Sequence, residues 1–242
     1  MAACDAAGVP VVEDAAHSLG TTWDGRKIGT LGKIGCYSFQ SYKLLNSGEG
    51  GIMVTDDPEL MARAIMMHGS YEDKWQHHDI PADVMARVQY NMPMFGLRLN
   101  TPSAVLIRAQ LEPLDQRVLD GRRNHDHVAK RLQALNSVKV PAAYAAELRA
   151  PDSLQFNLPH LSDDEVDAFV SDAKRRGLHI QVFGRSKNNS RAYWNWGFLN
   201  DVPDLPQTRA MLMRACDLRL PARLALAECD LIADTLIAAL GE

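Results

Sequence analysis

Three side chains with complementary chemistry lie near the start of this 242-residue chain. Asp14 ends a short apolar stretch, Ser38 lies in the next one, and Lys43 follows shortly after, before a glycine-rich loop. If the two stretches are neighbouring parallel strands, their carboxyl ends share one edge of a sheet, where α/β proteins bind ligands. We therefore expect the three side chains to face one crevice.

The three side chains match the needs of one cofactor. A lysine in a low-dielectric pocket can lose its proton and form a Schiff base with an aldehyde. A carboxylate can keep a pyridinium nitrogen protonated, and a hydroxyl with backbone N–H groups can hold a phosphate. Together these are the requirements of pyridoxal 5'-phosphate (PLP). Each residue also has an ordinary alternative: Asp14 as a turn former, Ser38 as a core hydroxyl and Lys43 as a solvated charge.

Composition places the chain among soluble globular proteins, because 46% of its residues are hydrophobic and 23% are charged. A formal net charge of −4 gives no reason to expect nucleic acid or an anionic membrane as partner. We see no apolar run of about 18 residues and no signal peptide. The four cysteines lack disulfide or zinc spacing, which favours reduced thiols in a cytoplasmic protein.

Strands and helices alternate in the first half of the chain. A complete helix signature covers 57–69, with a proline at the start, early acidic residues and Gly69 at the end. A turn is expected at Asp24-Gly25, and the residues from 70 to 100 are expected to be irregular. Strands are predicted over 9–14, 36–39 and 50–55. This order predicts an α/β fold with a mixed, mostly parallel sheet.

The second half has a different pattern. A helical period begins at Thr101 and breaks at Pro113, where we place the boundary between domains 1–115 and 116–242. The C-terminal domain is expected to be small and of the α+β type. Its predicted elements are strands over 153–159 and 178–183, a helix capped by Ser162 and a final helix over 227–240.

Two long motifs carry a resemblance to a known family. "VVEDAAHSLG" is followed by "GRKIGTLGKIGCYSFQSYKLLNSGEGGIMVTDD". This pattern resembles the DegT/DnrJ/EryC1/StrS aminotransferase family, and "AQLEPLD" (109–115) and "LRLPARLALAECDLI" (218–232) resemble later landmarks. The resemblance implies the PLP-dependent transferase fold of type I, with part of the large cofactor domain in 1–115 and the small domain in 116–242.

The resemblance also implies roles for individual residues. Lys43 matches the Schiff-base lysine that later moves protons at the substrate carbon. Asp14 matches the partner of the pyridine nitrogen, and His17 matches a position against the cofactor ring. Ser38 matches a phosphate ligand.

Two further cofactor ligands are implied less directly. The family carries a "GYNYRM" run in which an asparagine and an arginine contribute to the cofactor phosphate of the partner subunit. This chain has "GLRLNT" there, so Arg98 and Asn100 occupy those places in swapped order.

For function, the resemblance implies transfer of an amino group from glutamate or glutamine to a keto-sugar or keto-cyclitol, in a homodimer with shared active sites. The family carries a long segment before the "ED" strand, and we expect this chain to lack it, because only about a dozen residues precede Asp14. A fragment, a misassigned start, a natural truncation and half of a split enzyme are all open. A complementary N-terminal chain is therefore the alternative partner to a second copy.

Two alternative functions stay open. The chain could be a truncated, non-catalytic homologue that acts as a binding or assembly subunit. It could also keep the cofactor and dehydrate a deoxysugar, although related dehydratases carry a histidine where Lys43 stands.

Two other segments contain residues that could bind ligands. The stretch 182–196 is rich in Arg, Asn, Trp and Tyr, which fits either a substrate loop or a domain-docking loop. His77, His78 and Asp79 lack further spaced ligands, so we predict a solvated loop and no metal site.

Overall fold

The computed structural model describes residues 1–70, 72–186 and 188–242, which form two compact units. Unit 1 comprises Met1–Asp115 with Tyr144–Ala150, and unit 2 comprises Gln116–Ala143 with Pro151–Glu242. The sequence suggested a single boundary at residue 115. The segment Tyr144–Ala150 returns to unit 1 because its short strand β6 (Glu147–Leu148) pairs with β2 (Thr22–Trp23).

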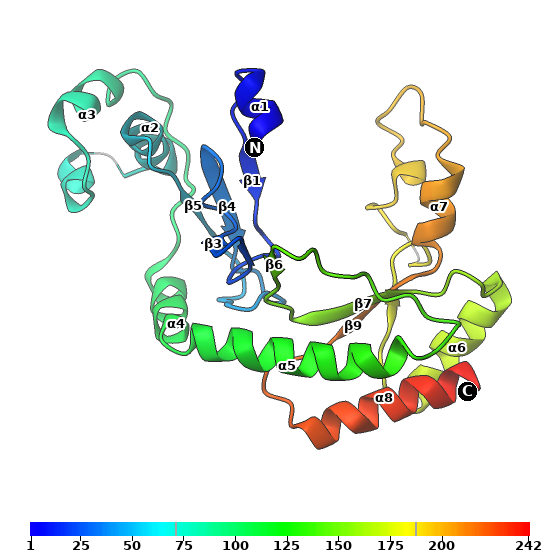
Figure 1. Cartoon of the computed structure of the whole chain (residues 1–242). Helices are drawn as coiled ribbons and strands as arrows, with labels where there is room; N and C mark the ends of the chain where they lie inside the picture. Colours follow the sequence, from blue (N-terminus) through cyan, green and yellow to red (C-terminus); the bar gives the residue numbers. More distant parts are fainter. Residues whose placement is uncertain (71, 187) are drawn as a thin grey trace. The chain divides into compact units, whose positions relative to one another are not determined.

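The sheet that carries the predicted site is a three-stranded mixed sheet in unit 1 (Figure 1). Its strands are β1 (Val12–Asp14), β4 (Ile34–Ser38) and β5 (Gly51–Val54), in the order β1-β4-β5. β1 and β4 are parallel, with Asp14 opposite Cys36, whereas β5 is antiparallel to β4. The α/β class and the mixed sheet are confirmed.

One detail of this sheet differs from the prediction. The apolar run before Asp14 suggested a buried strand, but β1 lies at the edge of the sheet and Val12 is 62% exposed. Apolar side chains become buried only when another layer covers them, and composition alone does not supply that layer.

A tight hairpin follows β1 in the chain. It joins β2 to β3 (Arg26–Lys27) through Asp24 and Gly25, whose φ angles are 48° and 75°. Two central residues with positive φ are the signature of the type I′ turn, which matches the twist of two paired strands. The predicted turn is confirmed.

The helix α2 (Pro58–His68) begins and ends as predicted. The Asp57 side chain accepts hydrogen bonds from the backbone N–H groups of Glu59 and Leu60, and Gly69 ends the helix with a φ of 100°. Acidic caps and left-handed glycines satisfy the backbone groups that helix ends leave unpaired.

The prediction of irregular structure from 70 to 100 was wrong for residues 72–77 and 82–88. This region contains the 3₁₀ helix η1 (Glu72–His77) and the helix α3 (Ala82–Val88). Val84, Met85 and Val88 of α3 are buried with α2 residues in one small core. The packing explains why so short a helix is stable, since isolated helices of this length are marginal.

Unit 1 is completed by two short elements of the chain. They are α1 (Ala2–Ala6) and α4 (Thr101–Leu111). Pro113 separates α4 from the long helix α5 (Leu114–Leu132), which continues into unit 2. The predicted break is confirmed.

Unit 2 has an antiparallel three-stranded sheet. The helices α5 and α8 lie along one side of this sheet (Figure 1). Its strands are β7 (Ser153–Asn157), β9 (Ala215–Arg219) and β8 (Gln181–Val182), in the order β7-β9-β8. Its other elements are α6 (Asp163–Arg175), η2 (Tyr193–Asn195), α7 (Pro206–Leu212) and α8 (Leu226–Leu240). Leu154 and Phe156 of β7 share one core with residues of α5, α6 and α8.

Polar contacts fix two places in unit 2. Ser162 and Glu165 form a reciprocal capping box at the start of α6, which confirms the predicted cap. Asn124 is fully buried in α5, and its amide nitrogen lies 3.1–3.2 Å from three backbone oxygens of the loop 221–224.

Within the described part of the chain, no helix is both long and apolar enough to cross a membrane.

Candidate active site

Lys43 and His17 form the centre of the candidate site. Lys43 Nζ lies 2.6 Å from His17 Nε2, which is within hydrogen-bond distance. The Lys43 side chain is half-buried, whereas His17 is exposed. A residue distant in sequence is thus held against the amine, and the only hint of this in the sequence was the family motif.

Asp14 and Ser38 lie at the same end of the sheet, because β1 and β4 run parallel and each residue is the last one of its strand. Asp14 Oδ1 accepts a hydrogen bond of 3.1 Å from the backbone N–H of Ala16, and the residue is otherwise exposed. Ser38 Oγ accepts one of 3.3 Å from the backbone N–H of Gln40. Both oxygens therefore keep capacity for a ligand.

The loop that carries Lys43 is anchored on both sides of the lysine. The Lys43 backbone N–H donates to the Gln40 carbonyl at 2.9 Å. Leu45 is fully buried beside Phe39 and Ile107 of α4. A buried leucine so close to the lysine limits how far its backbone can move.

A second anchor is a pair of amide hydrogen bonds between this loop and α4. Gln110 Nε2 donates to the Asn46 carbonyl at 2.7 Å, and Gln110 Oε1 accepts from the Asn46 backbone N–H at 3.3 Å. Gln110 belongs to the "AQLEPLD" landmark, but the sequence alone did not assign it this role. Long-range hydrogen bonds of this kind leave no local signal.

Glu13, next to Asp14, holds the glycine-rich loop that precedes β4. Its carboxylate accepts from the backbone N–H groups of Gly29, Leu31 and Gly32 at 2.7, 2.6 and 2.5 Å. Desolvation raises the pKa of this carboxyl, but the three hydrogen bonds and nearby Arg26 outweigh it, so the net pKa is lowered. No local pattern in the sequence indicates this anchor.

The glycines of this loop are needed because the backbone packs closely. A Cβ at Gly35 would overlap the Gly29 carbonyl, and one at Gly29 would overlap the Tyr37 ring. A Cβ at Gly32 would lie 2.7 Å from the Val11 carbonyl oxygen. The repeated glycines thus let the loop lie directly against the site sheet.

Arg98 and Asn100 contact the ends of helices α2 and α4. Asn100 Oδ1 caps α4 by accepting from the Ser103 backbone N–H at 2.9 Å. Arg98 lies beside the end of α2, where it adds to burial in lowering the pKa of His68. Between them, Leu99 contacts the glycine-rich turn at Gly50. A role for either side chain at a cofactor phosphate stays a prediction.

The segment 182–196 is held largely by its own polar side chains. Asn189 is buried and donates to the Phe183 carbonyl at 2.5 Å, while Trp196 Nε1 donates to the Ser190 carbonyl at 2.7 Å. Lys187, part of this segment, lies outside the described residues. These bonds explain the asparagines structurally, and a substrate role for the segment stays untested.

The motif at His77, His78 and Asp79 lies at the end of η1 and just beyond it. In residues 1–70, 72–186 and 188–242, no three His, Cys, Asp or Glu side chains are grouped closely enough to hold a metal ion.

Comparison with known proteins gives the family and two curated relatives. The model of the DegT/DnrJ/EryC1/StrS aminotransferase family matches residues 1–237. The chain is 30% identical over 201 residues to 3-amino-5-hydroxybenzoate synthase of Amycolatopsis mediterranei (strain S699), which is 81% of this chain and 49% of that protein. It is 34% identical over 143 residues to the putative pyridoxal phosphate-dependent aminotransferase EpsN of Bacillus subtilis (strain 168), or 59% of this chain and 34% of that protein.

Solved structures agree in fold. PseC of Helicobacter pylori, an aminotransferase involved in the biosynthesis of pseudoaminic acid, superposes with a TM-score of 0.81 at 15% identity. The match covers 99% of this chain and 62% of that one, and at this identity it shows the fold alone. The chain spans about half the length of the first relative, 49%. A family match over residues 1–237, with the sequence relatives and the shared fold, establishes that the chain belongs to the DegT/DnrJ/EryC1/StrS aminotransferase family.

Proposed function

We propose that the chain is a PLP-dependent aminotransferase that moves an amino group from glutamate or glutamine to a keto-sugar or keto-cyclitol. The observation that carries the proposal is the contact between Lys43 and His17, beside a sheet edge that also bears Asp14 and Ser38. The acceptor class rests on family membership, together with relatives whose names concern amino-compound biosynthesis.

The donor set fits PLP. The cofactor offers an aldehyde, a ring nitrogen that becomes cationic and a phosphate, and the site supplies an amine, a carboxylate and a hydroxyl. Asp14 and Ser38 both keep free hydrogen-bonding capacity on this edge. Lys43 would carry the cofactor covalently, Asp14 would face the ring nitrogen and Ser38 would donate to the phosphate.

The residues of the chain have separable tasks in this proposal. PLP, when bound, supplies an electron sink for the substrate carbon. Asp14 would keep a proton on the ring nitrogen by its negative charge, and Lys43 Nζ would move a proton at the substrate carbon. His17 Nε2 lies within hydrogen-bond distance of Lys43 Nζ, so His17 can orient the lysine amine and exchange a proton with it.

The first experiment tests covalent attachment. The purified chain is mixed with PLP, its visible absorption is recorded, borohydride is added and the modified lysine is found by peptide mapping. Lys43→Ala is compared with Lys27→Ala, a change at an exposed lysine of the same unit. We expect a visible band and a modified Lys43 in the wild type and in Lys27→Ala, and neither in Lys43→Ala.

The second experiment tests the reaction. Glutamate without any acceptor should yield one equivalent of 2-oxoglutarate per cofactor-loaded chain, because the amino group stays on the enzyme until a keto substrate arrives. Attachment of PLP to many surface lysines, with no preference for Lys43, would contradict the assignment of the site. Attachment at Lys43 with no 2-oxo acid formed from either glutamate or glutamine would contradict the proposed donor.

A second candidate function, as an assembly subunit, is favoured by exposed apolar side chains on α4. Val105, Leu106 and Leu111 are 61%, 54% and 52% exposed. Exposed apolar surface that is contiguous marks sites that bind other proteins. We propose that Val105 and Leu106, which are adjacent in the helix, contact a second subunit, either a second copy of the chain or a complementary chain.

Sedimentation velocity separates these partners. A dimer of the purified chain that Val105→Asp dissociates, and that Ala86→Asp at an exposed position of α3 leaves intact, supports a second copy. A monomer at high concentration favours the complementary chain. Association with no PLP attached at Lys43 would favour the assembly subunit over the enzyme.

A further inference from the structure

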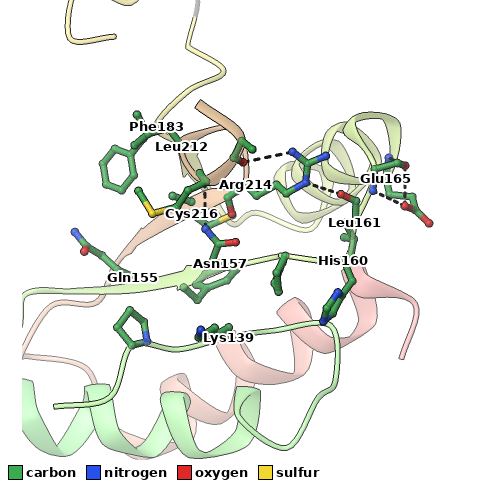
Figure 2. Close-up of a pocket in the computed structure, with 17 residues that line it drawn as sticks. Lys139, Gln155, Asn157, His160, Leu161, Glu165, Phe183, Leu212, Arg214 and Cys216 are labelled. Carbon is green, nitrogen blue, oxygen red and sulfur yellow. Dashed lines mark hydrogen bonds between the residues drawn. The ribbon is translucent and has the colours of Figure 1, made fainter. Parts of the chain in front are cut away.

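Unit 2 contains a cavity of about 980 Å³ that belongs to none of the site residues described above. Small-molecule sites in proteins span roughly 300–1,000 Å³, so its volume suits a ligand. Figure 2 shows Gln155 and Asn157 of β7 between Lys139 on one side and Phe183 and Leu212 on the other. The cavity is thus built from chain segments that are distant in sequence.

One wall of the cavity is apolar. Phe183 and Leu212 lie next to each other there, and Ala215 and Leu161 also line the cavity. All four side chains are half-buried, so each presents carbon atoms to the cavity. An aromatic ring placed against Phe183 would gain stacking as well as apolar burial.

The polar part of the lining contains hydrogen-bond donors that could bind an anion. Lys139 is fixed at its backbone by two hydrogen bonds of 2.8 Å with Asn157, so its side chain starts from a defined position. In the part of the chain that the structure describes, the Lys139 ammonium, the His160 imidazole and the Gln155 amide have no hydrogen-bond or ion-pair partner. An ammonium and an amide N–H group are ligands for an anion.

The lining contains two other charged side chains, and both have hydrogen-bond partners. Arg214 donates to the Leu161 carbonyl at 2.7 Å and forms an ion pair of 3.2 Å with Asp163. Glu165 accepts from the Ser162 backbone N–H and hydroxyl, both at 2.7 Å, and keeps its negative charge. The lining therefore has two cationic side chains, Lys139 and Arg214, against one carboxylate, and its net charge is positive.

We propose that this cavity binds a small amphipathic carboxylate, with its carboxylate against Lys139 and its apolar body against Phe183 and Leu212. The site is independent of the proposed PLP site, because its lining residues all belong to unit 2 and the Lys43 site belongs to unit 1. Such a ligand need not take part in amino-group transfer.

The test uses a matched pair of probes, 2-naphthoate and the uncharged 2-naphthamide. Each is titrated into the 242-residue chain while backbone amide signals are followed by NMR. We expect 2-naphthoate to shift the signals of Lys139, Asn157 and Phe183. The amide should bind about 1.5-fold to fivefold more weakly, which is the range for an exposed ion pair.

Three variants assign the site. Lys139→Met keeps the methylene stem and should reduce 2-naphthoate affinity to that of the amide. Ala215→Leu should weaken binding of both probes, because the larger side chain takes up space at the apolar wall. Lys174→Met, at an exposed lysine of α6, should change nothing.

Several results would overturn the proposal. They are no binding at millimolar probe, shifts that lie outside the cavity lining, and equal affinity for the two probes. An unchanged 2-naphthoate affinity in Lys139→Met would overturn it as well. Because Lys139 is exposed, that variant should fold even if Ala215→Leu does not.

Discussion

Replacing Glu13 by glutamine should destabilise unit 1 although the two side chains have nearly the same shape. Glu13 Oε1 accepts from Leu31 and Gly32, and Oε2 accepts from Gly29. A glutamine oxygen can keep at most the first two bonds. Its NH₂ group would then face the N–H of Gly29, where two donors repel each other and one backbone group stays unpaired.

The size of the effect follows from the number of bonds. A hydrogen bond to a charged group contributes about 1.5–3 kcal/mol. Solvent competes at a half-buried carboxylate, and part of the set survives in the variant. We therefore expect Glu13→Gln to lower the free energy of unfolding of unit 1 by ~2–4 kcal/mol.

The effect should also depend on pH. The folded pKa of Glu13 lies below the ordinary carboxyl value of 4.5. Its contribution to stability is therefore fully present above pH 4.5 and is lost as the pH falls through the folded pKa. The stability difference between wild type and Glu13→Gln should shrink over that acid range, because glutamine does not titrate.

Hydrogen exchange in the segment 29–32 measures the effect locally, and urea unfolding followed by circular dichroism measures it globally. A loss of 2 kcal/mol corresponds to roughly a 30-fold faster exchange. Glu59→Gln, at an exposed glutamate paired with Arg63, is the control and should cost less than ~0.5 kcal/mol. If exchange in 29–32 and the urea midpoint are both unchanged in Glu13→Gln, the anchoring role is wrong.

Three further predictions concern other places in the chain. Asn124→Ala should lower the stability of unit 2 by ~2–3 kcal/mol in urea unfolding, because it removes a buried amide from the carbonyl oxygens of 221–224. Gly35→Ala should prevent native packing of unit 1, seen as lost chemical-shift dispersion, because its Cβ would overlap backbone atoms. Burial raises the pKa of Cys216 to about 12, so at pH 8 iodoacetamide should modify exposed Cys36 and leave Cys216 unmodified until the chain is denatured, as read by mass spectrometry.

Helix ends were predictable because their partners lie within a few residues. Asp57 caps the backbone just after it, and Gly69 ends the same helix in a conformation that other residues avoid. Ser162 and Glu165 are likewise joined by the spacing of a capping box. A signal that is local in space and in sequence can be found without any knowledge of the tertiary structure.

The elements that were missed depend on distant contacts. The helix α3 is short and follows a polar, histidine-rich stretch, and the burial of Val84, Met85 and Val88 with α2 residues accompanies it. The strand β6 has two residues and exists as a partner of β2. Neither has a periodicity long enough to be recognised in the sequence.

The candidate site also combines features that the sequence predicts with features that depend on distant contacts. Asp14 and Ser38 could be placed together in advance, because residues that end neighbouring parallel strands meet at one sheet edge. The anchors of the Lys43 loop could not be predicted, because the hydrogen bonds between Gln110 and Asn46 join positions far apart in the chain. The chemical groups were predictable, whereas the contacts that hold them in place were not.

Glu13 and Asp14 show how a single short strand serves two purposes. Successive side chains of a strand point to opposite faces, so the two neighbouring carboxylates cannot do the same task. Glu13 has its oxygens bonded to the loop that precedes β4, whereas Asp14 accepts one bond from Ala16 and stays exposed. Exchanging the two tasks would leave the loop without its anchor and the site without its charge. Glu13→Gln should therefore weaken the fold of unit 1 before it affects ligand chemistry, and Asp14→Asn should do the reverse.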